Sequence, residues 1–170
     1  MRSIMLVICS ALLLVLSTSP AGAAEPALRP AAEADQQALV NAVRANRKAL
    51  VAVNLNLSAE EAAKFWPLYD RYQAEINAIG DRVLAIVNEY IATFQHLSDK
   101  QALRLMTDYL SVEGERLKVR QTYLPEFAKI LPGRTVARFY QLDNKMDALL
   151  RYDLAATIPV VDEKAPAAAK

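Results

Sequence analysis

Apolar residues recur at steps of three and four over most of the chain, which is the period of an amphipathic α-helix. The longest such run covers residues 59–94, with apolar positions at Ala62, Phe65, Tyr69, Tyr72, Ile76, Ile79, Val83, Ile86 and Tyr90. We therefore predict one helix over this segment, which at ~1.5 Å per residue would be roughly 54 Å long.

A row of leucines marks the next segment. Its members stand seven residues apart, at Leu103, Leu110, Leu117, Leu124 and Leu131. Strict heptad spacing is typical of a left-handed packing seam. Because the preceding helix supplies a partner within the chain, we expect the row to pack inside an antiparallel hairpin rather than to form a dimer zipper. Dimerisation would then use a second apolar face, formed by Leu105, Val112 and Val119.

Weaker periodic patterns predict one helix on each side of this hairpin. A short N-terminal helix over residues 35–54 carries apolar positions at Leu39, Ala42, Val43, Ala49, Leu50 and Val53. A C-terminal helix follows Pro132 and Gly133 and ends before Ile158, with an apolar side formed by Val136, Phe139, Tyr140, Leu142, Met146, Leu149 and Leu150. The pattern predicts an all-α, elongated four-helix protein whose domain covers residues 35–158.

The flanking segments 24–34 and 159–170 have no helical period and are rich in alanine and proline. Such composition is typical of disordered chain ends, so we predict a disordered linker and a disordered tail.

Helix starts and prolines refine the hairpin. Ser58 with Glu61, and Ser98 with Gln101, have the spacing of capping boxes, in which each side chain satisfies a free backbone donor. Pro67 and Pro125 fall inside the two long helices, and a proline there removes a hydrogen bond and clashes with the preceding turn. A turn near His96 would place the two prolines at one level, which predicts a bent hairpin.

The N-terminus has the three parts of a secretory signal peptide. A base at Arg2 precedes an apolar run over residues 4–16, and the small residues Ala21, Gly22 and Ala23 follow. The run is shorter than the ~20 residues that a membrane-spanning helix needs. We predict a signal peptide over residues 1–23, cut after Ala23, and an exported protein. The single cysteine, Cys9, lies inside it, so the mature chain must be stabilised by packing alone.

Charge gives no reason to expect a polyanionic partner. Without Arg2, the 20 basic residues become 19, against 19 acidic residues. Bases and acids are also interspersed along the chain. We therefore predict no nucleic-acid binding and no stable membrane insertion.

The sequence also lacks the residue patterns of catalysis. His96 is the only histidine, and a metal site normally gathers several ligands, so we interpret it as an exposed loop residue. Asp143 and Asp147 share a helix face, but the polar neighbours Asn144 and Lys145 favour a solvated surface. We predict no catalytic residue, no metal, no cofactor and no enzymatic activity.

Aromatic side chains gather where the predicted hairpin ends. Phe65, Trp66, Tyr69, Phe139 and Tyr140 are the candidates for contact with a client or partner protein. Their helical spacing fits core packing equally well, and we favour core packing for the group. Trp66 is the residue we expect to be partly exposed, because Phe65 and Tyr69 already occupy the packing seam.

Two stretches, 57–71 and 131–145, share one pattern: Leu, Ala, a base, Phe, a second aromatic, Leu, Asp or Asn, and a base. Over residues 35–150 the chain resembles the Spy/CpxP family of periplasmic helical proteins, which carry two Leu-Thr-x-x-Gln motifs. Residues 57–61 match the first motif conservatively, with Leu57, Ser58 and Glu61. The second copy keeps Leu131 but departs from the motif over residues 132–135.

The resemblance implies a periplasmic envelope-stress protein, an ATP-independent chaperone that binds unfolded clients. The alternative is a sensory or adaptor protein that docks on a membrane stress-signalling or metal-response partner, for which the sequence offers fewer candidate ligands. The expected partners are unfolded or partner envelope proteins, and a homodimer is possible. Chaperones of this family have a basic concave face, from which the neutral mature charge departs.

Overall fold

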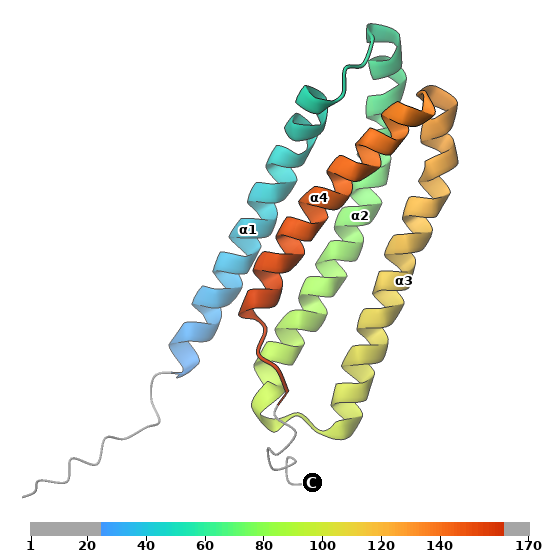
Figure 1. The fold of residues 1–170 in the computed structure, drawn as a ribbon. Helices are drawn as coiled ribbons and strands as arrows, with labels where there is room; N and C mark the ends of the chain where they lie inside the picture. Colours follow the sequence, from blue (N-terminus) through green and yellow to red (C-terminus); the bar gives the residue numbers. More distant parts are fainter. Residues whose placement is uncertain (1–24, 162–170) are drawn as a thin grey trace, which may run out of the picture.

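The structure is a computed structural model that describes residues 25–161 and, within the first helix, the side chains of Ala38 and of the residues from Asn41 onward. Its elements are the helices α1 (Glu25–Asn54), α2 (Ala59–Thr93), α3 (Asp99–Ile130) and α4 (Gly133–Thr157), with a 3₁₀ turn η1 (Phe94–His96) between α2 and α3 (Figure 1). Residues 25–161 contain no strand, so the fold is all-α. The predicted signal peptide and residues 162–170 of the predicted tail lie outside the described residues.

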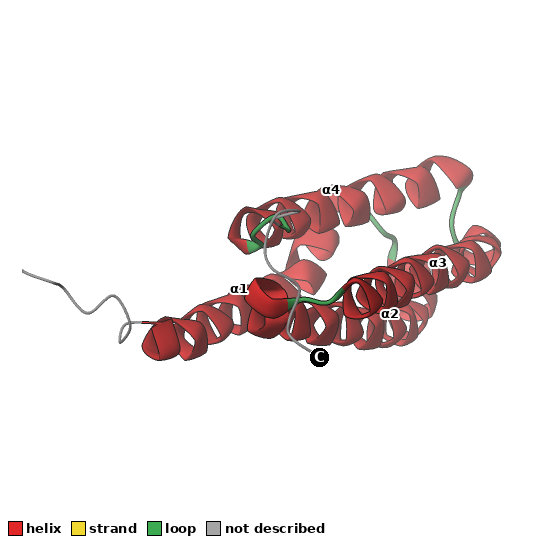
Figure 2. Ribbon diagram, turned by 90° about the horizontal axis from the view of Figure 1, so that it is seen from below, coloured by secondary structure: helices red, strands yellow, loops and turns green. Residues whose placement is uncertain are grey.

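The four helices run antiparallel to their neighbours in the chain. α2 packs mainly on α3 and α4 mainly on α1, whereas α3 and α4 approach each other in few places. Figure 2 shows α4 on one side of the α2–α3 hairpin. The α1–α2 and α3–α4 connections lie together at what we call the aromatic end, and η1 lies at the opposite, turn end.

Both predicted capping boxes are present. At the start of α2, the Ser58 amide donates to a Glu61 carboxylate oxygen over 2.8 Å, and the Glu61 amide donates to the Ser58 hydroxyl over 3.2 Å. Ser98 and Gln101 form the same reciprocal pair at the start of α3. The two helices continue through Pro67 and Pro125 without a break, and a kink at either position stays a prediction.

The first helix is longer than predicted. α1 begins at Glu25, so residues 25–34, predicted as a disordered linker, are helical, and the helix is 30 residues long rather than short. Alanine, glutamate and arginine in this stretch are good helix formers. Pro26 lies in the first turn, where a missing amide hydrogen costs no helical bond. Proline content was therefore a poor guide to disorder here.

The hydrophobic core lies at the aromatic end and joins all four helices. It is formed by Val51, Leu55, Phe65, Leu68, Tyr69, Tyr72, Ile76, Phe127, Leu131, Val136 and Phe139. Leu57 packs against this cluster and Leu131 is part of it. The two copies of the repeated pattern therefore meet at one end of the bundle, as the sequence predicts.

The prediction for the leucine row was wrong. Only Leu131 is buried, whereas Leu103, Leu110, Leu117 and Leu124 are between 47% and 71% exposed. The face that packs inward carries Leu105 and Val112, together with the larger side chains of Tyr123 and Phe127. Burying aromatic rings removes more apolar area from water than burying leucines does, so the aromatic face of α3 turns toward the core.

Candidate functional site

The aromatic residues proposed for client contact are mainly core residues. Phe65, Tyr69 and Phe139 are buried and surround one another with ring centroids 5.5–6.0 Å apart. Trp66 and Tyr140 are partly buried and pack against the same cluster, so Trp66 is more exposed than Phe65, as predicted. Phe65, Tyr69 and Phe139 are thus closed to a partner of the folded protein.

The apolar surface of the bundle lies instead along α3. Leu103, Met106, Leu110, Leu117 and Leu124 are all exposed, and we call this row the α3 stripe. A stripe that follows one helix over three heptads is more continuous than the scattered apolar residues that soluble proteins normally expose.

A groove between α3 and α4 continues the stripe toward the aromatic end. It has a volume of about 450 Å³ and is lined mainly by apolar side chains, among them Leu124 and Ala128 of α3 and Val136, Ala137 and Tyr140 of α4. Since Leu124 belongs to both features, the α3 stripe and this groove form one apolar surface.

A buried charged cluster lies on the inner side of the same helices. The Arg47 guanidinium of α1 donates over 2.9 Å to the Asp143 carboxylate of α4 and also donates to Asp147. The Tyr72 hydroxyl donates to the second Asp143 oxygen over 2.7 Å. Arg47, Asp143 and Asp147 are 3%, 0% and 7% exposed. The prediction of a solvated face for the two aspartates was therefore wrong.

The burial of Asp143 and Asp147 has a physical cause on α1. Arg47 turns inward to meet the aspartates, and Val51 one turn later is fully buried with it. The apolar positions Leu50 and Val53, predicted to face the core, are exposed as a result. A buried carboxylate needs a charged or hydrogen-bonding partner, and this requirement sets the rotation of the helix.

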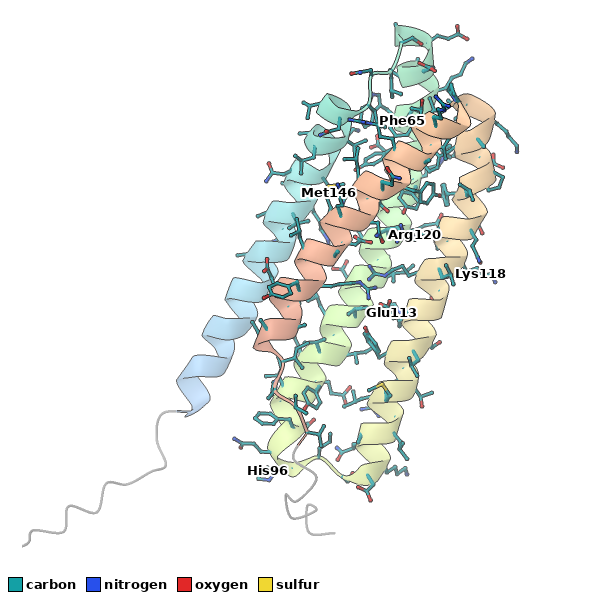
Figure 3. All side chains as sticks on the ribbon, viewed as in Figure 1. Phe65, His96, Glu113, Lys118, Arg120 and Met146 are labelled. Carbon is teal, nitrogen blue, oxygen red and sulfur yellow. The ribbon has the colours of Figure 1, made fainter. Side chains whose placement is uncertain are left out.

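Two arginines of α3 complete the cluster, which we call the charged layer. Arg116 Nη1 lies 3.7 Å from Asp147, and Arg120 lies 3.8 Å from both Asp143 and Asp147. Figure 3 shows Arg120 and Glu113 directed from α3 toward α4, whereas Lys118 points away from the bundle. Neither Arg116 nor Arg120 donates a side-chain hydrogen bond to the described residues. Their guanidinium groups therefore have donors that no described side chain accepts, and Arg116 Nε is a buried one.

Burial and charge shift the pKa values of this layer. Burial raises the pKa of the Asp143 carboxyl above its ordinary value, although Arg47 opposes the shift. Burial also disfavours the Arg47 cation, but Asp147 and Asp143 outweigh it, so the pKa of Arg47 is raised. Burial is the main cause of the raised pKa of Tyr72, whose hydroxyl faces Asp143. Within the layer, Arg47 therefore stays charged and Tyr72 stays protonated.

Sequence reasoning missed Arg47, Arg116 and Arg120. A signal for them existed, because Arg116 and Arg120 stand four residues apart, as Asp143 and Asp147 do, and such spacing puts each pair on one helix face. Two pairs of opposite charge on consecutive antiparallel helices suggest a cluster between the helices.

Within residues 25–161, no three His, Cys, Asp or Glu side chains are grouped closely enough to hold a metal ion. His96 is exposed in η1.

Comparison of the chain with models of known protein families, with curated proteins and with solved structures finds no match. No helix in the described part of the chain is long and apolar enough to cross a membrane.

Proposed function

We propose that this protein acts by binding rather than by catalysis, as an ATP-independent chaperone that holds apolar segments of unfolded envelope proteins. The observation that carries the proposal is the α3 stripe, a continuous apolar surface on a folded helix. The resemblance of residues 35–150 to the Spy/CpxP family supports the same class, and the signal-like pattern of residues 1–23 supports action in the periplasm.

The arrangement of the bundle fits such a role. The aromatic core keeps the helices together without help from the α3 stripe, so the stripe remains available for a partner. Each exposed leucine offers apolar area that a client's own exposed side chains can cover, at about 25 cal/mol per Å² buried. The adjoining groove adds a concave surface lined by Val136, Ala137 and Tyr140.

Aggregation of an unrelated unfolded client, followed by light scattering without nucleotide, tests the proposal. The purified protein should slow aggregation at equimolar ratio, and the double variant Leu110→Ser, Leu117→Ser should lose most of this effect. The matched control is Val53→Ser with Leu149→Ser, which removes two apolar side chains exposed elsewhere on the bundle. Equal suppression by both double variants, or none by the wild type, would overturn the proposal.

A second candidate is an adaptor that docks on a helix of a membrane-bound stress-signalling partner. The regular seven-residue spacing of the α3 stripe favours it, because heptad leucines are suited to a second helix. The conformation of the bound ligand distinguishes the two candidate functions. An adaptor should bind a folded helical peptide and leave client aggregation unchanged, whereas a chaperone should bind the unfolded client. Sedimentation of the isolated protein tests whether a second copy covers the stripe.

A further inference from the structure

The bundle contains a cavity that neither the α3 stripe nor the proposed function uses. Its volume is about 250 Å³, close to the lower limit of the ~300–1,000 Å³ typical of small-molecule sites. It lies between the charged layer and the turn end, is lined by residues of all four helices and is partly open to solvent. The core cluster, by contrast, fills the bundle on the aromatic side of the layer.

The wall of this cavity is polar at one end and apolar at the other. Toward the charged layer it carries Arg47, Arg116 and Asp147. Toward the turn end it carries Val83 and Val87 of α2 with Leu154 and Ile158 of α4. Residues 147 and 158 of α4 are 11 positions apart in a largely helical segment, so at ~1.5 Å per residue the two ends are separated by roughly 16 Å. The cavity thus has the polarity of a site for an amphiphile.

The polar end has hydrogen-bonding groups that no described residue satisfies. Gln73 Oε1, Glu113 Oε1 and Arg116 Nε are buried atoms without a hydrogen-bond partner in this part of the chain, and all three residues line the cavity. The Arg116 side chain is only 13% exposed, and its contacts to Glu113 and Asp147, at 3.6 and 3.7 Å, are longer than hydrogen bonds. Buried polar groups are nearly always paired, and of these three atoms Arg116 Nε is the donor, so this end offers a donor to a polar group that accepts.

The guanidinium groups of the polar end identify the preferred kind of group. Three guanidinium groups of the cavity wall face the layer, from Arg47, Arg116 and Arg151. Three carboxylates oppose them, from Asp143, Asp147 and Glu113. Arg44 also lines the cavity, but it is paired with Asp81 at 2.9 Å. Arg47 and Arg151 donate hydrogen bonds to these carboxylates, whereas Arg116 donates none to them. A guanidinium with free donors suits a carboxylate, which it can bind through two parallel hydrogen bonds.

We propose that the cavity binds a single-chain alkyl carboxylate, a free fatty acid of medium length. The carboxylate accepts hydrogen bonds from Arg116, and the chain runs toward Val87, Leu154 and Ile158. A phospholipid with two long chains is too large for a volume of about 250 Å³. The site is distinct from the α3 stripe, since its walls are the inner faces of the helices.

Titration calorimetry with decanoate, decanol and decylamine, each below its micelle concentration, tests the class of ligand. Decanoate should bind with one site per chain and at least tenfold more tightly than decanol, and decylamine should be weakest because Arg116 repels it. Decanoate should also raise the melting temperature, since a ligand that binds only the folded state stabilises it. Equal affinity for the three compounds, or no binding of decanoate, would overturn the proposal.

Variants then locate the ligand. Arg116→Gln should weaken decanoate at least tenfold while leaving decanol nearly unchanged, whereas Lys118→Gln removes a charge from the outer face of α3 and should change neither. Val83→Phe fills the apolar end without touching the charges and should abolish binding of both compounds. If Arg116→Gln fails to fold, Val83→Phe still decides the matter. Undiminished decanoate binding by Val83→Phe, or an equal loss in Lys118→Gln, would rule out this site.

Discussion

The two ends of the bundle differ in how their interiors are packed. At the aromatic end, the rings of Tyr69, Tyr72, Phe65, Phe127 and Phe139 are the largest fully buried side chains described, and they form one continuous cluster. Between the charged layer and the turn end, buried residues such as Leu84, Leu105 and Val112 lie outside this cluster, and a cavity separates the helices. The aromatic end therefore supplies most of the packing stability, which leaves the rest of the bundle free for binding.

Phe139→Ala should show the largest difference between the regions. Phe139 has no exposed surface and contacts five other rings, with the Phe127 centroid 4.8 Å away. Its truncation should cost about 3–5 kcal/mol of unfolding free energy, the usual range for a buried phenylalanine. Leu117→Ala, at an exposed position, should change it by less than about 0.5 kcal/mol. Urea denaturation followed by circular dichroism measures both, and similar losses would contradict the placement of Phe139 in the core and of Leu117 at the surface.

Asp143→Asn should have the next largest effect. It leaves the buried Arg47 cation with one carboxylate fewer, which should cost about 3 kcal/mol, the lower end of the range for a broken buried ion pair. Asp70→Asn is the matched control, because Asp70 pairs with Lys48 at the surface and its loss should cost less than about 1 kcal/mol. Urea midpoints compare the two. Equal losses would show that the layer contributes no more than a surface pair.

Alkaline pH should weaken the aromatic end selectively. Burial raises the pKa of Tyr140 to about 12 and raises those of Tyr69 and Tyr72 further above their ordinary value. The folded state thus holds these protons more tightly than the unfolded state. The resulting stability is complete below pH ~10 and is lost as the pH rises through the folded-state pKa values.

In a pH titration, these tyrosines should ionise together with the loss of helical signal. Tyrosinate absorbance and circular dichroism, recorded on one sample, measure the two events. Tyr152→Phe, at an exposed position, should leave the transition unchanged. Full ionisation of all seven tyrosines in a protein that remains helical would contradict the prediction.

Removing one capping box at a time should give the smallest and most local effects. Ser58→Ala and Ser98→Ala each delete one helix cap, at about 1 kcal/mol. Ser58 adjoins the aromatic core, so its loss should lower the stability of the whole domain. Ser98 adjoins the turn end, so its loss should mainly increase hydrogen exchange in the first turns of α3. Identical exchange patterns in the two variants would show that the bundle unfolds as one unit from either end.

Local signals in the sequence predicted the elements well. The period of residues 59–94 and the two capping boxes placed α2 and the start of α3 within one or two residues, because helix initiation depends on side chains three positions apart. The long N-terminal helix was missed because its first residues carry Pro26 and Pro30. Proline is tolerated in the first turn of a helix, which accounts for Pro26, whereas Pro30 lies one turn further inside and is accommodated at the loss of one helical hydrogen bond.

The direction in which each helix faces was predicted less well. Heptad spacing shows that Leu103 and Leu110 share a stripe, but it does not say whether that stripe meets the partner helix. On α3, two stripes compete and the one with Phe127 is buried. On α4, Asp143 reads as a surface residue until Arg47, 96 positions earlier in the chain, is placed beside it. Such long-range pairing is absent from any local pattern.

The charged layer also limits how the bundle can move. Apolar side chains tolerate sliding, because one methyl group replaces another with little loss. A slip of α4 along α1 by one turn, about 5.4 Å, would instead bring Asp143 to the place of Asp147 and leave one carboxylate without a guanidinium. The charged layer therefore fixes the register of α1, α3 and α4. Because the layer holds the helices at this position, we expect the cavity to widen only when the helix segments between the layer and the turn end bend away from one another.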